Sequence, residues 1–444
     1  MSTLRFLAIG LIFAAVSIAW CVLGTTVQVR TSDLDDSLSA EMASLWGPKL
    51  LAQASPYCAA GADDGRTQPG ASAPSASTIT ADIRHQHRYK GLLWYSTFTV
   101  DFTGEYEVAA AEAPDAGEPP ATTTFVFPLP SGAATYHALS VALDGNDIAI
   151  APSDIPSGRI AVPLTRGAAH RVKVHYVTGG QEAWLYAPGD VPATDADGDV
   201  PSVARAESLT ELRDFSLTVT TDFADIDYPR GALSPRQRAT PADGGMQAAW
   251  SYPNLITRQA IGIAMPRRQN AGPIAARMSF FAPVSLLFFF TVLFAVVVLK
   301  DIRLHPMHYL FIAGGFFAFH ILMAYLADLV NIHASFWIAA AVSVFLVVSY
   351  MRLVAGVRFA VTYTALAQLV YLVGFSYAFF WRGRTGLTVT IAAVATLFVL
   401  MQATGKVNWH EVFQRPPRAT SPPPPMPGTP PTTPRPTDEP PAQG

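Results

Sequence analysis

The sequence predicts an α-helical polytopic membrane protein with six transmembrane helices and a large inserted all-β exported domain. Two observations predict this fold class. Six apolar runs have about the length, ~20 residues, that a helix needs to cross the hydrocarbon core. Between the first run and the other five, a long segment alternates apolar and polar residues with a period of two, which is typical of strands.

The N-terminal part of the chain divides into three predicted segments. Phe6 to Leu23 is an apolar run of 18 residues, longer than the apolar region of most cleaved signals, so we expect a transmembrane signal-anchor helix in residues 1–24. Cleavage after Gly24 is the alternative. Residues 25–54 are predicted as an amphipathic stalk helix, and residues 55–78 as a flexible linker of Ala, Gly, Pro and Ser. The apolar positions that predict the stalk are Leu34, Leu38, Met42 and Leu45.

Residues 79–276 are predicted to form the exported, antiparallel β domain. Phe98, Val100 and Phe102 alternate with polar residues, as expected for a strand with one buried face. Apolar alternation on both sides of the Asp144-Gly145-Asn146-Asp147 segment predicts a hairpin. Many such short strands without helical periodicity between them indicate a sandwich or a barrel-like domain.

Residues 277–404 are predicted as a five-helix transmembrane bundle. The polar breaks between the runs are too short to fold separately, so each helix must return beside its neighbour. Residues 405–444 form a tail whose Pro and Thr content predicts disorder. The five runs are Phe280 to Leu299, Tyr309 to Val330, Ala334 to Met351, Phe359 to Phe380 and Gly386 to Ala403.

The charge distribution limits the function and sets the expected orientation. Residues 25–278 hold 19 Lys and Arg against 28 Asp and Glu, and this acidic excess argues against nucleic-acid binding. Basic residues in the short loops, such as Lys300, Arg352 and Arg358, favour cytoplasmic termini and an exported β domain.

No catalytic, cofactor or metal site is predicted. The two cysteines, Cys21 and Cys58, lie at different depths and are not expected to pair. Asp195 to Asp199 lacks the glycine and glutamate positions of a calcium loop, and His85 and His87 share a strand face without an evident third ligand. No phosphate-binding Gly-rich loop, nucleophile elbow or HExxH motif is present.

Three polar residues in the apolar runs are candidate functional residues. His320 lies in the middle of its run, Asp328 lies eight residues further on, and Gln368 lies in the middle of another run. Ionisable residues at this depth are often functional, so a proton path through His320 and Asp328 is one hypothesis. The alternative is a neutral His320 hydrogen-bonded between helices.

The segment Arg303-Leu304-His305-Pro306-Met307-His308-Tyr309-Leu310 resembles the loop before a membrane helix in the CreD family of inner-membrane proteins. Arg303, His305, Pro306 and Met307 are the family-like loop residues. The resemblance extends to Gly47-Pro48-Lys49-Leu50, Tyr89-Lys90-Gly91-Leu92-Leu93-Trp94-Tyr95, Gln247-Ala248-Ala249-Trp250 and Lys406-Val407-Asn408-Trp409.

The resemblance implies a multi-pass protein of the bacterial inner membrane that contributes to cell-envelope integrity and stress tolerance. It implies no enzymatic activity and no catalytic residues to transfer. The expected partners are the lipid bilayer, other envelope proteins and cell-wall components, with the oligomeric state left open. The alternative function is a transporter or channel-like protein in which the exported domain is an accessory binding module.

Overall fold

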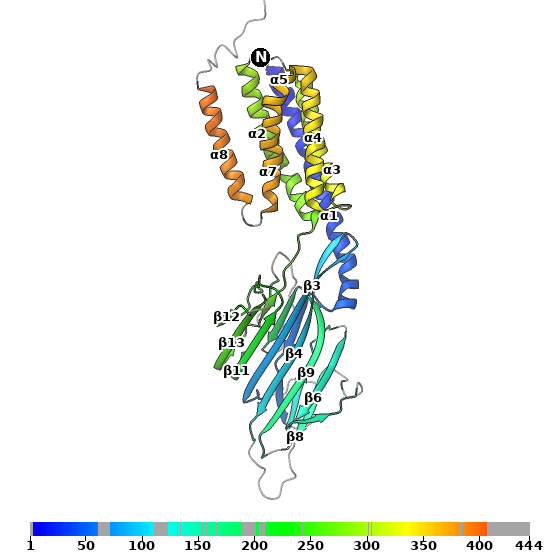
Figure 1. Ribbon diagram of the computed structural model, residues 1–444, viewed down its shortest axis with the longest axis vertical. Helices are drawn as coiled ribbons and strands as arrows, with labels where there is room; N and C mark the ends of the chain where they lie inside the picture. The colour runs from blue at the N-terminus through cyan, green and yellow to red at the C-terminus, as the bar shows by residue number, and fades with distance from the viewer. Residues whose placement is uncertain are drawn as a thin grey trace, which may run out of the picture. The chain divides into compact units, whose positions relative to one another are not determined.

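The computed structural model describes most of the chain (Figure 1). The described residues are 3–405, apart from 61–71, 111–122, 131, 134, 152–154, 156–157, 166, 189–200, 204–205, 207–208, 242–243, 301, 303, 382 and 384. Arg303, the acidic turn predicted at residues 195–199, residues 61–71 of the predicted linker and nearly all of the tail therefore lie outside the described residues. The described residues form two compact units: unit 1 within Met1–Trp20, Phe281–Phe319 and Ala340–Gly444, and unit 2 within Cys21–Phe280 and His320–Ala339.

The six predicted apolar helices are confirmed. Each is long and apolar enough to cross a membrane. The fifth contains two π-helical segments, η2 (Ala360–Thr364) and η3 (Leu369–Gly374). Five of the helices are α1 (Thr3–Trp46), α2 (Ala271–Leu299), α3 (Pro306–Leu326), α4 (Ile332–Ala355) and α8 (Thr385–Thr404). The fifth helix in chain order is Val357–Phe380, which lies between α4 and α8. It consists of α5 (Val357–Phe359), η2, α6 (Ala365–Gln368), η3, α7 (Phe375–Tyr377) and η4 (Ala378–Phe380).

The N-terminal part of the chain differs from its prediction in three places. The stalk is not a separate segment, because α1 continues without a break to Trp46. The predicted stalk is also too long: Gly47 has a positive φ of 92° and Pro48 follows it, so the helix ends and strand β1 (Leu50–Ala54) begins. Two parts of the predicted linker are strands instead. Residues 57–60 form β2 (Tyr57–Ala60), whose small side chains Cys58 and Ala59 are buried, and residues 76–78 are the start of β3 (Ala76–Lys90).

The β domain consists of one large sheet and two small ones. The large sheet has the strand order β12-β13-β11-β3-β4-β9-β6-β7, and the small sheets have the orders β1-β10-β14 and β2-β5-β8. The remaining strand bounds are β3 (Ala76–Lys90), β4 (Leu93–Val108), β5 (Thr123–Pro128), β6 (Tyr136–Leu143), β7 (Asn146–Ile148), β8 (Arg159–Leu164), β9 (His170–Gln181), β10 (Ala183–Ala187), β11 (Thr210–Thr221), β12 (Gln237–Ala239), β13 (Met246–Thr257) and β14 (Ile261–Ala264).

The prediction of a purely antiparallel domain is wrong at two pairs of strands. Strand β11 runs parallel to β3, with Phe215 opposite Ser77, and β1 runs parallel to β10, with Leu50 opposite Ala183. Alternation in the sequence indicates which face of a strand is buried, and that pattern is the same for parallel and antiparallel neighbours. The predicted hairpin is confirmed, because β6 and β7 pair across Asp144 and Gly145, both with positive φ.

One aromatic-rich core holds the three sheets together. Its largest side chains include Trp184, Trp250 and Phe102, all with 0% exposure. The ring of Phe102 stacks on that of Tyr176 with centroids 4.8 Å apart. Cys58 belongs to this core, and burial raises the pKa of its thiol to about 11.

Candidate functional site: the junction between α1 and the β domain

The end of α1 is joined to the β domain by main-chain contacts around Gly47. The Gly47 amide donates to the Ala43 carbonyl at 3.0 Å, which closes the last helical turn. A Cβ at Gly47 would overlap the carbonyl oxygen of Gly179, so only glycine lets the two backbones approach this closely. The buried side chain of Gln181 donates to the Gly47 carbonyl oxygen at 2.7 Å, and its own amide donates to the Pro48 carbonyl at 2.9 Å.

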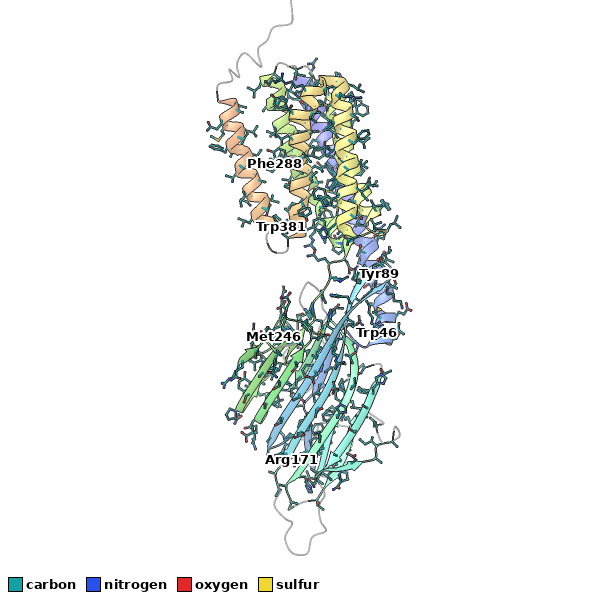
Figure 2. The ribbon with its side chains drawn as sticks, viewed as in Figure 1. Trp46, Tyr89, Arg171, Met246, Phe288 and Trp381 are labelled. Atoms are coloured by element: carbon teal, nitrogen blue, oxygen red, sulfur yellow. The ribbon has the colours of Figure 1, made fainter. Side chains whose placement is uncertain are left out.

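The β3–β4 turn packs against the last turns of α1. Met42 forms a buried apolar cluster with Leu93 and Tyr95, and the partly buried side chains of Leu34, Leu38 and Trp46 complete it. The guanidinium carbon of Arg88 lies 3.5 Å from the centroid of the Trp46 ring. Figure 2 shows Trp46 and Tyr89 near each other at one end of the large sheet, with Arg171 towards the other end. The amphipathic pattern of the predicted stalk is thus explained, except at Leu45, which is 56% exposed.

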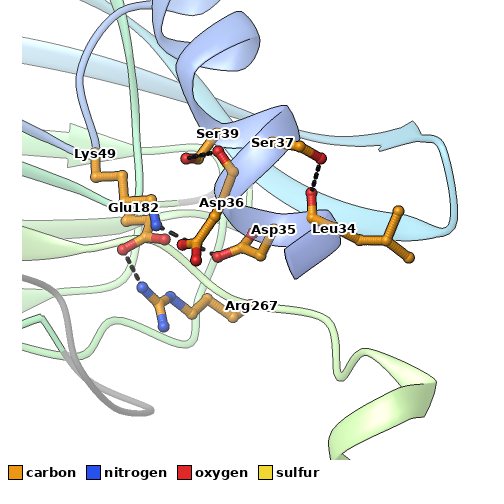
Figure 3. Close-up of polar contacts among 8 residues, drawn as sticks. All are labelled: Leu34, Asp35, Asp36, Ser37, Ser39, Lys49, Glu182 and Arg267. Carbon is orange, nitrogen blue, oxygen red and sulfur yellow. Dashed lines mark hydrogen bonds and ion pairs between the residues drawn. The ribbon is translucent and has the colours of Figure 1, made fainter. Parts of the chain in front are cut away.

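Two ion pairs lie beside this contact (Figure 3). Lys49 Nζ is 3.5 Å from Asp35 Oδ2 on α1, and Arg267 pairs with Glu182, which precedes β10. Arg267 belongs to the segment that leads from β14 to α2. The segment that leaves α1 and the segment that leads to α2 therefore each contribute one cation to the same cluster.

Glu182 is the most buried carboxylate of this cluster. Burial raises the pKa of its carboxyl above the ordinary value, while Arg267 and then Lys49 act in the opposite direction. Burial, and next the Asp35 carboxylate, likewise raise the pKa of the Tyr95 phenol. The pKa values of both groups therefore depend on the charged side chains of this junction.

The paired histidines on β3 are positioned by hydrogen bonds. The His85 and His87 rings have centroids 4.4 Å apart. Ser96 donates its hydroxyl to the Pro266 carbonyl at 2.8 Å, so Nε2 of His85 donates to Ser96 Oγ, also at 2.8 Å. Asp222 accepts from the His85 main-chain amide. Within the described part of the chain, no three His, Cys, Asp or Glu residues are grouped as metal ligands.

The pKa of His85 yields a prediction for the stability of the β domain. Burial, and next the neighbouring His87, lower this pKa from 6.5 to about 4. The unfolded chain therefore takes up a proton in a range where folded His85 stays neutral, so stability is lost as the pH falls from 6.5 towards 4. Because the ring is only partly buried, we expect a loss of roughly 1–2 kcal/mol.

Urea unfolding of the full chain in nanodiscs at several pH values, followed by tryptophan fluorescence, measures this effect. His85→Gln should lose less stability than the parent protein between pH 6.5 and 4. An identical pH dependence in both proteins would show that His85 does not carry the effect.

The three candidate residues of the apolar runs have different partners and different degrees of burial. Asp328 is paired with a cation of α1: its Oδ2 is 2.7 Å from Arg30 Nη2, and the Arg30 guanidinium also lies over the Tyr325 ring. His320 is buried, with 2% exposure, in unit 2. Gln368 is buried in unit 1, where its Nε2 donates to Ser343 Oγ at 3.0 Å and Ser343 donates to the Gly315 carbonyl at 2.6 Å.

The described residues of the family-like loop lie at the start of α3. Pro306 is the first residue of α3, where a missing amide proton costs nothing. Nδ1 of His305 accepts from the Met307 amide at 3.3 Å, and His308 Nδ1 lies 2.7 Å from the Tyr350 hydroxyl on α4. Met307 is 46% exposed. These contacts connect the described part of the loop to α4.

Sequence reasoning missed most of the junction residues. Glu182, Arg267 and Asp35 carry no motif, and their partners are distant in sequence. The signal that was present is the family-like segment Gly47 to Leu50, which connects the end of α1 to the start of β1.

The fold and the junction together define a class of protein: a membrane protein of several apolar helices with a β domain inserted between the first helix and the second. The family model described as Inner membrane protein CreD matches residues 246–410, and this confirms the resemblance to the CreD family that the sequence motifs indicate. The matched range includes β13, the loop at Arg303 to Leu310 and the last five helices.

Other comparisons add little. No curated protein matches the sequence. A solved structure of a candidate nutrient binding protein from Legionella pneumophila is similar over 62% of this chain and 84% of its own chain, with 10% identity and a TM-score of 0.27. A TM-score of that size does not establish a shared fold.

Proposed function

We propose that this chain is a bacterial inner-membrane protein that supports cell-envelope integrity and stress tolerance through its β domain, without enzymatic activity. In this proposal both termini are cytoplasmic and the β domain is exported to the periplasm. The bilayer, other envelope proteins and cell-wall components are the proposed partners. The observation that carries the proposal is the junction, where α1 passes directly into the β domain through Gly47 and strand β1.

The construction of the junction favours a positioning role. A domain that only needs to be tethered can be joined by a flexible linker, whose end-to-end distance varies widely. Here the Gly47 and Pro48 carbonyls are held by Gln181, and the Lys49 carbonyl accepts from the Ala183 amide at 3.1 Å. This arrangement maintains a fixed orientation between the last turns of α1 and the sheet, as expected of a domain that must present one surface at a defined height.

The test measures how much the β domain and the buried polar residues of the helices each contribute to the tolerance of cells to envelope stress. A chain in which residues 50–264 are replaced by a Gly/Ser linker should reduce tolerance to the level of a strain without the protein. His320→Leu and Gln368→Leu should leave tolerance near normal. Western blots of membrane fractions establish that each variant is inserted at the parental level.

Transport is the second candidate function, because one specific observation favours it. Gln368 lies between two π-helical segments, which are frequent at functional sites, and it is connected through Ser343 to a main-chain carbonyl of α3. Loss of function in His320→Leu and Gln368→Leu at normal protein levels, with tolerance retained after the domain replacement, would make transport the better proposal.

A further inference from the structure

Cationic side chains gather at one end of unit 1. Lys300 directly follows α2, Arg352 lies in the last turn of α4, and Arg358 lies in the first turn of the next helix. Two contacts connect these helix ends: Lys300 Nζ lies 5.6 Å from the centroid of the Tyr363 ring, and His308 at the start of α3 bonds to Tyr350 of α4. Figure 1 shows α5 and the start of α1 at this same end of the unit.

These cations have no carboxylate partners among the described residues of unit 1, which include no Asp or Glu. Lys300, Arg352 and Arg358 are all exposed. Within the described part of unit 1, their positive charge is therefore not balanced by an acidic side chain. Solvent ions could balance the charge of a water-exposed surface, so the cations alone do not identify a ligand. A second property of the surface is needed to do so.

That property is the apolar surface beside the cations. Leu353 is 78% exposed, Val357 60% and Leu299 47%, and each is one or a few residues from a cation. The two tyrosines at this level, Tyr350 and Tyr363, are residues that membrane proteins place at headgroup depth. A ligand that complements this surface has an anionic group joined to a long apolar chain.

We propose that this end of unit 1 binds the phosphate headgroup of an anionic phospholipid of the surrounding leaflet. Lys300 and Arg358 contact the phosphate, with Tyr363 beneath Lys300, and the acyl chains lie along the exposed apolar residues next to them. Free phosphate shares the anionic chemistry but not the acyl chains, so it does not complement the whole surface.

The test measures phospholipid binding to the full chain by native mass spectrometry in a neutral detergent. Phosphatidylglycerol and phosphatidylcholine with the same acyl chains are titrated separately, and inorganic phosphate is titrated in a third series. The parent protein should retain phosphatidylglycerol in preference to the other two. Lys300→Gln/Arg358→Gln should weaken that binding about 30-fold, since each cation near an anionic lipid surface contributes ~1 kcal/mol.

Two further variants keep the outcome interpretable. Arg84→Gln/Arg258→Gln removes the same charge from exposed positions of the β domain and should bind phosphatidylglycerol like the parent. Lys300→Arg/Arg358→Lys should also bind like the parent, and circular dichroism shows that each variant is folded. Equal binding of phosphatidylglycerol and phosphatidylcholine by the parent, or an equal loss in both glutamine double variants, would overturn the proposal. Competition by inorganic phosphate at similar concentrations would identify a phosphate site instead and would likewise overturn it.

Discussion

Gly47→Ala is expected to destabilise the β domain by about 3 kcal/mol or more, the largest effect of any single substitution considered. Two costs add. A residue with a side chain at a positive φ costs on the order of 1–2 kcal/mol. The new Cβ would also overlap the Gly179 carbonyl oxygen, which belongs to the backbone of β9 and can move only if the sheet moves.

Gly145→Ala is the matched control for this prediction. Gly145 also has a positive φ, 85°, but nothing lies within 4 Å of a Cβ built there. It should therefore show only the cost of the backbone conformation, about 1 kcal/mol. Urea unfolding of the full chain in nanodiscs, followed by tryptophan fluorescence, measures both. If the two variants lost the same stability, the close approach of Gly47 to β9 would not matter.

Arg267→Met is expected to cost about 2 kcal/mol, because it leaves the Glu182 carboxylate without its nearest cation. Removing one partner of a buried ion pair costs ~3–5 kcal/mol, and the partial exposure of both side chains, 23% and 16%, reduces this. Adding Glu182→Gln to Arg267→Met should recover most of the loss, since a neutral amide needs no counter-charge.

The pH dependence of Arg267→Met provides a second check on the same pair. The pKa of Glu182 is already raised by burial, and without Arg267 it rises further. A raised carboxyl pKa means that the folded state gains stability as the pH falls through it. The loss caused by Arg267→Met should therefore be larger at pH 8 than at pH 5, whereas the double variant should show a nearly constant loss. A constant loss in the single variant would mean that Arg267 does not influence the ionisation of Glu182 between pH 5 and pH 8.

The parts of the fold that local pattern determines were predictable from the sequence. Apolar runs of membrane length located all six helices, and alternation with an Asp-Gly turn located the β6–β7 hairpin. The parallel pairing of β1 with β10 was not predictable, because strand direction depends on where a distant segment returns. Residues 57–60 have the composition of a linker, yet they pair with β5 and become buried, an example of tertiary contacts overriding propensity.

The candidate site was less predictable than the fold. Asp328 was identified from its place in an apolar run, but its partner Arg30 lies almost 300 residues earlier in the chain, so its ion pair left no local trace. Glu182 and Arg267 were not identified at all, since a charged residue next to a strand usually faces solvent. Their burial follows from the arrangement of β10 against the segment after β14, which only the structure reveals.

The parallel pairing of β1 with β10 also determines the order in which the chain can mature. Leu50 leaves the ribosome long before Ala183, its partner, and the third strand of that small sheet ends only at Ala264. Contacts between such distant residues form late, because the intervening loop must close first. During synthesis α1 is complete while β1 still has an unpaired edge, and unpaired edges are prone to pairing with other chains. We therefore expect the edge of β1 that pairs with β10 to stay unpaired in the nascent chain until β10 has been made.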